Sequence, residues 1–205
     1  MKFKTVTSIL GMTAPVLYLL AVVSGPIFWT EYRSMRDTVS LLASDGSPMR
    51  GLISFLFVTH NVLLLLFGFG WRFVQRKETR KGNLAAILIS VFGFLGIVMI
   101  YFPQDGMGSH LTFIGVMHIV LAGVMSLITI LAMFFRGLAE WRVHGQKKMS
   151  VYSFTSLFFA FTTGVLTTIN IAGQWEAGGL LERLTIGGFL QWVFVEALML
   201  YRRKI

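Results

Sequence analysis

The sequence predicts an all-α membrane protein, a single bundle of six transmembrane helices with both termini in the cytoplasm. Of its 205 residues, 55% are hydrophobic and only 13% are charged, whereas about a quarter of the residues of a soluble domain are charged. The apolar residues form long blocks, and about 20 helical residues cross the hydrocarbon core of a bilayer. Because lipid offers the backbone no hydrogen bonds, only helices and closed barrels span membranes. The blocks are too long and alternate too little for barrel strands.

Six blocks can each cross the bilayer, and together they make one transmembrane domain over residues 1–205. They cover about 7–29, 52–74, 83–102, 111–135, 151–172 and 183–201. The first block follows Lys2 and Lys4, as the core of a signal peptide would. Its apolar part is longer than such a core, and Pro26 fits poorly just after the small residues that cleavage would require. We therefore expect an uncleaved first span.

The basic residues alternate between the two sides of the predicted bundle. Fourteen of the 18 lysines and arginines lie at the chain ends or beside the second–third and fourth–fifth connections. The other side holds only Arg33, Arg36, Arg50 and Arg183, together with six acidic residues. The positive-inside rule then places both termini in the cytoplasm. Basic flanks beside anionic lipids also account for the net charge of +9, so the expected partners are membrane lipids and not nucleic acid.

The first outer connection, about 30–51, is the longest. Tyr32, Met35, Val39 and Leu42 recur in it at helical spacing, which predicts a short amphipathic helix on the membrane surface. The chain has no cysteine, which excludes disulfides, thiolate metal sites and cysteine nucleophiles.

Polar residues inside the spans are costly in lipid and are therefore candidates for function. His60 and His118 each lie eight residues from the outer end of their span, about 12 Å deep at 1.5 Å per residue. Two histidines at one depth can face each other. The further candidates for the lining of an outward-facing pocket are Asn61, Thr163, Thr167, Asn170 and Gln191. The alternative is that such residues only bridge neighbouring helices, and that each histidine is a hydrogen-bonded packing residue.

Asp105 and His110 bracket the second outer connection, and Gly106 between them lets the chain fold back over the helix that carries His118. His60, Asp105 and His118 are then candidate catalytic residues or ligands of a divalent metal such as zinc, with an open position for water. His110 and His118 project about 80° apart on a helix and cannot chelate one ion unaided. Asp105 can alternatively be a turn or cap residue. A third possibility is a b-type haem between His60 and His118.

The mouth of this pocket is predicted to contain Asp37, Ser40, Glu182 and Arg183. Neighbouring residues of a helix point about 100° apart, so Glu182 and Arg183 each need another partner. We expect Arg183 to reach toward Asp105 or Asp37 and tie the outer loops together, or to hold a lipid phosphate. The inner half of the bundle is poorer in polar groups, and Glu196 there either snorkels or pairs with a basic residue.

Several short motifs have a familiar order. Asp37-Thr38-Val39-Ser40-Leu41, with Leu42 as the final position, resembles the D-x-x-S-x-L pattern of the DUF998 family of bacterial and archaeal membrane proteins. Phe102-Pro103-Gln104-Asp105 and Gly115-Val116-Met117-His118 are similar to its F-P-x-D and G-x-x-H elements, and Gly179-Leu180-Leu181-Glu182-Arg183 to its G-L-x-[EQ]-R element. The resemblance covers nearly the whole chain. It implies six helices, an outward polar cluster and a prokaryotic plasma membrane, but no established catalytic residue. The topology is distantly similar to the Frag1/DRAM/Sfk1 lipid-associated proteins.

The leading hypothesis is that the outward pocket binds or processes a lipid-like amphiphile. Metal-assisted hydrolysis, resembling that of seven-helix lipid amidases, is one form of it, although the chain lacks their His-x-x-x-His pair. The alternative is a protein without enzymatic activity, either a small transporter or a partner in a membrane complex.

Overall fold

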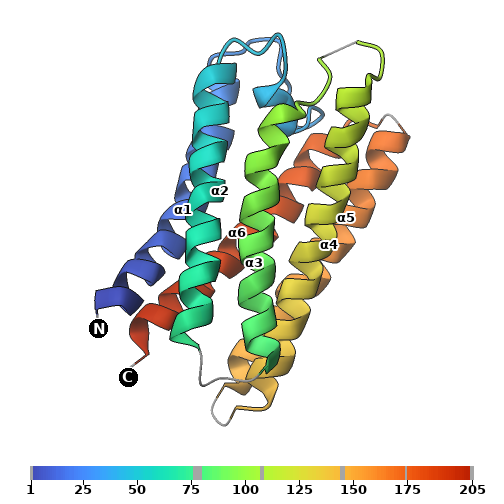
Figure 1. Cartoon of the computed structure of the whole chain (residues 1–205). Coiled ribbons are helices and arrows are strands. Elements are labelled where there is room, and N and C mark those ends of the chain that lie inside the picture. Colours follow the sequence, from blue (N-terminus) through green and yellow to red (C-terminus); the bar gives the residue numbers. More distant parts are fainter. Residues whose placement is uncertain (1, 76–79, 107–108, 144–145, 174, 204–205) are drawn as a thin grey trace.

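The computed structural model describes residues 2–75, 80–106, 109–143, 146–173 and 175–203. Within these ranges the chain is helical and contains no strand (Figure 1). The long helices are α1 (Lys2–Ile27), α2 (Arg50–Val74), α3 (Arg80–Val98), α4 (Phe113–Trp141), α5 (Lys147–Ala172) and α6 (Gly178–Arg202). Two short 3-10 helices, η1 (Ser40–Ala43) and η2 (Met99–Tyr101), lie in the connections at one end.

All six long helices are long and apolar enough to cross a membrane, which confirms the predicted six-helix membrane bundle. Several helices extend beyond the predicted spans: α1 begins at Lys2, α4 continues to Trp141 and α6 begins at Gly178. The reason is physical, since apolar composition marks the stretch inside the hydrocarbon, whereas backbone hydrogen bonding continues into the interfacial region.

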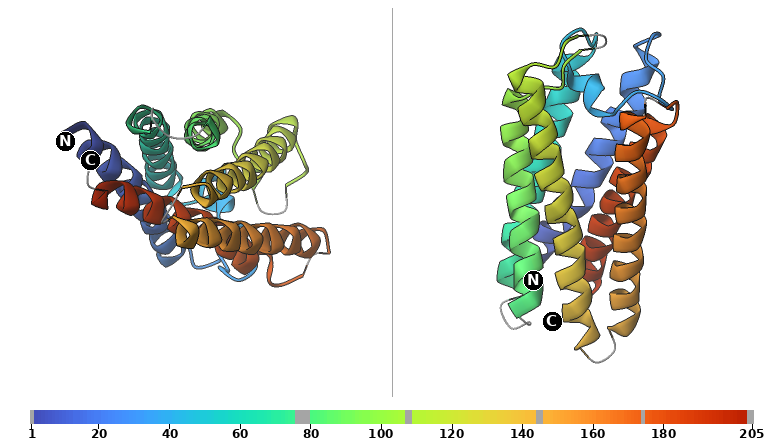
Figure 2. Two further views of the ribbon diagram at one scale, coloured as in Figure 1. Left: turned by 90° about the horizontal axis from the view of Figure 1, so that it is seen from below. Right: turned by 90° about the vertical axis from the view of Figure 1, so that its right-hand side faces the viewer.

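The helices form a closed ring in chain order, in which each packs on the next and α6 returns to pack on α1 (Figures 1 and 2). Both termini therefore lie at the same end of the bundle, and Lys4 Nζ donates to the Tyr201 carbonyl oxygen at 3.1 Å. The apolar core joins α1, α2, α4 and α6 through Ala14, Phe67, Met133 and Trp192.

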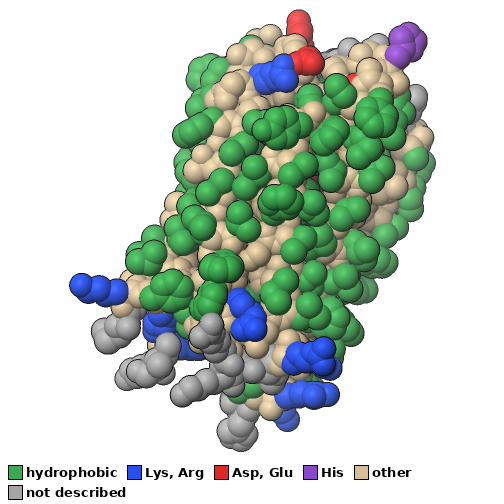
Figure 3. Space-filling view, viewed as in Figure 1, with side chains coloured by type: hydrophobic (Ala, Val, Ile, Leu, Met, Phe, Trp, Pro, Cys, Tyr) green, Lys and Arg blue, Asp and Glu red, His purple; other side chains and the backbone are tan. Residues whose placement is uncertain are grey.

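The outer surface between the two ends is apolar, as a lipid-facing surface must be. Figure 3 shows hydrophobic side chains over the length of the visible face, with Lys and Arg gathered at the end that carries the termini. Exposed side chains with more than half of their surface free are found on several helices, among them Val23, Phe55, Ile119, Leu127 and Phe158. The bundle therefore has a lipid-facing belt and one basic end.

Small residues allow some of the helices to approach closely. At Gly93 on α3, an added Cβ would lie 2.5 Å from the carbonyl oxygen of Asn61 and from the backbone nitrogen of Leu65, both on α2. A backbone cannot move aside as a flexible side chain can, so α2 and α3 can have this spacing only with glycine at 93. Gly187 on α6 has open space instead.

The connection between α1 and α2, called loop one below (residues 28–49), differs from its prediction. Instead of an amphipathic helix on the membrane surface, it contains only the short η1 and folds back into the end of the bundle. Val39 and Leu42 are fully buried, whereas Met35 is 56% exposed. Leu42 packs against Gly25 of α1, where an added Cβ would lie 2.9 Å from it. The apolar residues of loop one thus bury against helices and not against lipid.

Arg183 on α6 holds loop one in this position. Its Nη1 donates to the carbonyl oxygens of Ser34 at 2.6 Å and of Asp37 at 3.0 Å. Its Nη2 donates to the hydroxyl of Tyr32, and the guanidinium lies 5.5 Å from the centre of that ring. Burial raises the pKa of Tyr32 to about 12, so the hydroxyl keeps its proton and can bond to the carbonyl oxygen of Thr38 at 2.8 Å. The predicted reach of Arg183 toward Asp37 is confirmed, but it ends on the backbone and not on the carboxylate.

The first turn of α6 binds loop one as well. Its backbone N–H groups have no partner within the helix; Gly179 donates to the carbonyl oxygen of Arg36 at 3.0 Å and Leu180 to that of Met35 at 2.8 Å. A Cβ at Gly179 would lie 2.3 Å from the Asp37 carbonyl oxygen, so this approach requires glycine. Glu182 completes the contact by accepting from the Val39 N–H at 2.6 Å.

We predict that Gly93→Ala destabilises the bundle, because the methyl group would force the backbones of α2 and α3 apart. The expected loss is about 1–3 kcal/mol, which lowers the melting temperature in detergent by roughly 3–10 °C. Gly187→Ala is the matched control and should leave stability unchanged or raise it by about 0.5–1 kcal/mol. Equal melting temperatures for the two variants would contradict the close α2–α3 contact.

We further predict that Arg183→Lys loosens loop one although it keeps the charge, because an ammonium cannot reach the carbonyl oxygens and the Tyr32 hydroxyl together. Loss of hydrogen bonds from a charged donor costs about 2–3 kcal/mol, or roughly 5–10 °C in melting temperature. Arg33→Lys, in the exposed part of the same loop, is the control. If both variants melt together with the wild type, Arg183 does not hold the loop.

Candidate functional site

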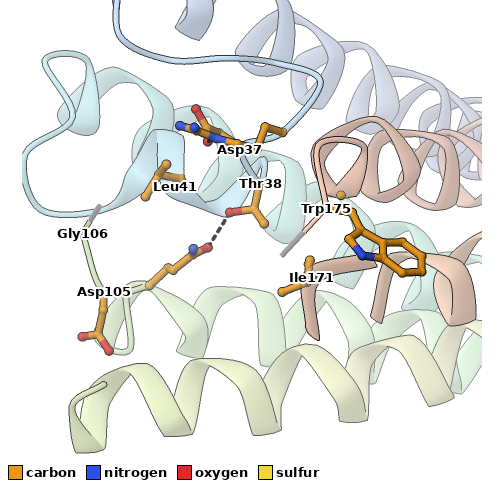
Figure 4. Close-up of a pocket in the computed structure, with 10 residues that line it drawn as sticks. Asp37, Thr38, Leu41, Asp105, Gly106, Ile171 and Trp175 are labelled. Carbon is orange, nitrogen blue, oxygen red and sulfur yellow. Dashed lines mark hydrogen bonds and ion pairs between the residues drawn. The ribbon is translucent and has the colours of Figure 1, made fainter. Parts of the chain in front are cut away.

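A pocket with a volume of about 340 Å³ lies at the end of the bundle opposite the termini (Figure 4). Three segments distant in sequence form it, namely loop one, the connection from α3 to α4, and the region where α5 gives way to α6. Its lining consists of Arg36, Asp37, Thr38, Leu41, Gln104, Asp105, Gly106, Ile171, Trp175 and Gly178.

The polar wall of the pocket joins loop one to the α3–α4 connection. The Thr38 hydroxyl donates to Gln104 Oε1 at 2.8 Å (dashed in Figure 4), and the Ser40 hydroxyl donates to the same oxygen. Asp37 is 8% exposed; its carboxylate accepts from Arg36 Nε at 2.8 Å and from the Arg33 backbone N–H at 2.7 Å. The negative charge of Asp37 is therefore compensated within loop one.

Asp105 contributes backbone to the pocket but directs its carboxylate elsewhere, away from Thr38 and Leu41 in Figure 4. The two carboxylate oxygens accept from the Thr112 hydroxyl at 2.7 Å and the Thr112 N–H at 2.9 Å. These hydrogen bonds lower the pKa of Asp105, so it remains ionised. A Cβ at Gly115 would lie 1.9 Å from this carboxylate. Asp105 therefore organises the start of α4, which is the alternative role expected for it.

The opposite wall is apolar. Ile171 and Trp175 form it and are 48% and 60% exposed, whereas Leu41 of η1 is buried and lies on the loop-one side beside Thr38 (Figure 4). In Figure 4 the Ile171 and Trp175 side chains lie at the same side of the pocket, Ile171 in the last turn of α5 and Trp175 in the connection to α6. The pocket thus offers polar groups on one side and an apolar surface on the other.

The two intramembrane histidines contact different segments of the chain. His60 is 2% exposed, with its Nδ1 2.8 Å from the Ala14 carbonyl oxygen on α1, and its ring meets that of Tyr18 at 4.9 Å. His118 Nδ1 lies 2.8 Å from the carbonyl oxygen of Phe102. Because a carbonyl only accepts, both Nδ1 atoms carry the hydrogen. Each ring thus anchors a neighbouring backbone segment.

The metal site of His60, Asp105 and His118 stays a prediction without support from the described residues. Among the residues that the structure describes, no group of three or more His, Cys, Asp or Glu side chains could hold a metal ion. Equal depth was counted from predicted helix ends, whereas His60 lies ten residues after Arg50 and His118 only five after Phe113. Depth also carries no information on direction around a helix, and His60 faces α1. The hypothesis of a haem between His60 and His118 stays a prediction that these contacts do not support. The remaining histidine candidate, His110, is exposed.

The polar residues of α5 bond to their own helix or to α6. The hydroxyls of Thr163 and Thr167 donate to carbonyl oxygens one turn earlier, both at 2.8 Å. Thr163 also accepts from Thr185 of α6 at 2.9 Å, and Asn170 accepts from the Ala177 N–H at 3.1 Å. These contacts correspond to the alternative reading, in which such groups bridge helices.

Gln191 and Asn61 behave in the same way. Gln191 Nε2 donates to the Ser156 hydroxyl of α5 at 2.9 Å, and Asn61 Nδ2 donates to the Phe57 carbonyl oxygen at 2.8 Å. Neither residue lines the pocket. Their role in lining an outward-facing pocket therefore stays a prediction.

A cluster of buried charges near the termini end was missed from the sequence. Arg136 and Glu140 of α4 and Glu196 of α6 are each at most 2% exposed. Arg136 Nε lies 3.0 Å from Glu196 Oε2, so of the two roles expected for Glu196 the structure has the ion pair. Arg136 was interpreted as part of a basic flank, and the inner half of the bundle was expected to be poorer in polar groups. The four-residue spacing of Arg136 and Glu140, which brings side chains to one helix face, was the available signal.

The comparison with known families agrees with the resemblance of the four sequence motifs to the DUF998 family. Residues 12–199 match the family described as "Protein of unknown function (DUF998)". No curated protein and no solved structure matches the chain. The matched range includes all four segments that resemble the family's motifs, and the structure brings each of them to the end of the bundle that contains the pocket. This six-helix membrane protein belongs to the DUF998 family.

Proposed function

We propose that this protein binds the anionic headgroup of an amphiphilic lipid in the pocket between loop one, the α3–α4 connection and the α5–α6 junction. The observation that carries the proposal is the two-sided lining of this pocket, with Arg36, Thr38 and Gln104 on the side of loop one and the α3–α4 connection, and Ile171 and Trp175 on the other side (Figure 4). Its place at one end of the membrane-spanning helices, where headgroups meet acyl chains, supports the same conclusion.

The polar wall favours an acceptor-rich, anionic group. No described residue accepts a hydrogen bond from the terminal nitrogens of Arg36, whose Nε alone pairs with Asp37, and the side chain is 41% exposed. Gln104 uses its oxygen for Thr38 and Ser40, and its amide nitrogen donates to none of the described residues. The Asp105 carboxylate is engaged by Thr112. The groups left for a ligand are donors, and a planar guanidinium suits a phosphate.

The size and the apolar wall favour a headgroup with attached chains over a free anion. A volume of about 340 Å³ is at the lower end of ligand pockets, which run from about 300 to 1,000 Å³, and is enough for a headgroup but not for a whole lipid. Exposed Ile171 and Trp175 then offer a path along which acyl chains leave toward the bilayer. Hydrolysis is outside the proposal, because no metal-binding group supports it among the described residues.

The pocket is proposed to open to the non-cytoplasmic side of a prokaryotic plasma membrane. The gathering of Lys and Arg at the termini end (Figure 3) supports this orientation through the positive-inside rule. In this orientation the ligand would come from the outer leaflet, and membrane lipids are the proposed partners.

Arg36→Ala should weaken binding of a short-chain phosphatidylglycerol by roughly tenfold, because a charged donor to the phosphate is worth about 1.5–3 kcal/mol. The measurement is isothermal titration calorimetry on the purified protein in a neutral detergent. Arg33→Ala, three residues earlier and outside the pocket lining, removes the same charge and should change the dissociation constant by less than about twofold.

The apolar wall can be tested with Ile171→Ala, for which Ile169→Ala is the matched control. The two residues lie two positions apart on α5, and Ile171 is 48% and Ile169 49% exposed. Only Ile171→Ala should weaken binding, by roughly threefold to tenfold for the buried methyl and methylene groups lost. If Arg36→Ala and Arg33→Ala bind equally and the two isoleucine variants do too, the lipid does not occupy this pocket.

The orientation can be measured separately, since the chain has no cysteine of its own. A membrane-impermeant maleimide added to intact cells should label Glu176→Cys, in the exposed α5–α6 connection. It should label Lys148→Cys, exposed at the start of α5, only after the membrane is permeabilised. The reverse pattern would place the pocket in the cytoplasm.

A further inference from the structure

The buried charges near the termini end form a compact arrangement around one guanidinium. Arg136 Nε lies 3.0 Å from Glu196 Oε2 and 3.1 Å from Glu140 Oε1. The hydroxyl of Ser153 on α5 lies 3.0 Å from Glu140 Oε2 and 3.4 Å from Glu196 Oε1. The two carboxyl groups therefore share both neighbours, and each lies within reach of the other.

The surroundings of this pair are closed to solvent. Trp192 Nε1 of α6 donates to the Ser153 hydroxyl at 3.1 Å, and the Trp71 ring of α2 lies 5.0 Å from the Arg136 guanidinium. Gln75, one helical turn beyond Trp71, is 2% exposed. Among the described residues, the groups beside the pair are thus Arg136 from α4, Ser153 and the more distant Tyr152 hydroxyl from α5, and Trp192 from α6, while Trp71 of α2 covers Arg136.

Among the residues that the structure describes, the charges of this arrangement do not balance. Two ionised carboxylates against one guanidinium would leave an uncompensated negative charge inside a closed apolar bundle, and this costs several kcal/mol. Like charges in contact avoid this cost when one of them takes up a proton. The arrangement therefore requires one more positive charge.

One carboxylate oxygen of this pair is buried without a hydrogen-bond donor. Arg136 Nε carries a single hydrogen, which points to Glu196. Glu140 Oε1 is buried and accepts no hydrogen bond, although it lies within ion-pair distance of that nitrogen. Both polar atoms of the Gln75 side chain and Trp71 Nε1 are also buried without a hydrogen-bond partner among the described residues. Glu140 Oε1 thus needs a hydrogen, and the two carboxylates carry one negative charge more than Arg136 neutralises. A single bound proton would satisfy both requirements.

We propose that Glu140 and Glu196 form a proton-binding site, in which the two carboxyl groups share one proton taken from water and their remaining negative charge pairs with Arg136. A sodium or divalent cation fits less well, because hard cations require about six or more oxygen ligands. Here two carboxyl groups and one hydroxyl are supplied, and no group of three acidic or histidine side chains exists in the described part of the chain. A shared proton titrates as a property of the pair.

The decisive measurement is infrared difference spectroscopy of the purified protein at neutral pH, in the region where a protonated carboxyl group absorbs. The wild type should show a carboxyl band that is missing from both Glu140→Gln and Glu196→Gln, because either remaining carboxylate alone balances Arg136. Buried Glu182 is present in every sample and cancels in the difference. Glu176→Gln, exposed in the α5–α6 connection, is the control and should keep the band.

A second readout covers the case in which one variant does not fold. Each single variant should melt within a few degrees of the wild type at neutral pH, since glutamine resembles the protonated acid. The double variant should lose more stability than the two single variants together, because it leaves Arg136 without a counter-charge. Sodium chloride and choline chloride should have the same effect on the wild type.

Three outcomes would overturn the proposal. An unchanged band in both single variants would mean that both carboxylates are ionised. Additive melting shifts in the double variant would mean that the two carboxyl groups do not share a charge. Stabilisation by sodium but not by choline would assign the site to a metal cation and not to a proton.

Discussion

The docking of loop one on the first turn of α6 is the interaction on which the pocket depends. An irregular loop that folds into a helix bundle brings backbone N–H and C=O groups that need hydrogen-bond partners, and α6 supplies both an acceptor and a donor. Arg183 donates to loop-one carbonyl oxygens, while the neighbouring Glu182 accepts the Val39 N–H. Because these side chains diverge on the helix, they reach two sides of the loop and fix it in two directions. The polar wall of the pocket belongs to the same loop and is placed by the same contacts.

The sequence predicted the helices well because the membrane imposes one simple rule on the backbone. It also predicted the partner of Arg183 in part. Arg183 is a single basic residue at the outer end of α6, and the acidic residues on that side lie mainly in loop one and the α3–α4 connection. One of these two segments was therefore its expected partner. The sequence could not show that the guanidinium would bind carbonyl oxygens, since backbone positions are unknown until the loop is folded. Loop one itself was misjudged because helical spacing of Tyr32, Val39 and Leu42 fits burial against α1 and α6 as well as burial in lipid.

The histidines and the buried charges show two limits of predicting contacts from residue positions along a helix. His60 and His118 shared a predicted depth, but the direction of a side chain depends on which helices are neighbours, and His60 faces Ala14 of α1. Arg136 was assigned to a basic flank because the apolar block ends near it, whereas α4 continues to Trp141 and keeps Arg136 inside. The pair of Arg136 with Glu196 joins residues sixty positions apart. Only the closure of the ring brings them together.

That closure has a consequence for biosynthesis. The helices leave the ribosome in chain order, so α6, which completes the ring against α1, is the last to be made. It carries Glu182 and Arg183 for one end of the bundle and Glu196 for the other. Until α6 is inserted, loop one lacks its contacts with α6 and Arg136 lacks one of its two carboxylates. A prematurely ended chain would therefore be defective at both ends at once. It would present the exposed backbone of loop one, and an Arg136–Glu140 pair without its α6 partner, to the quality-control proteases of the membrane.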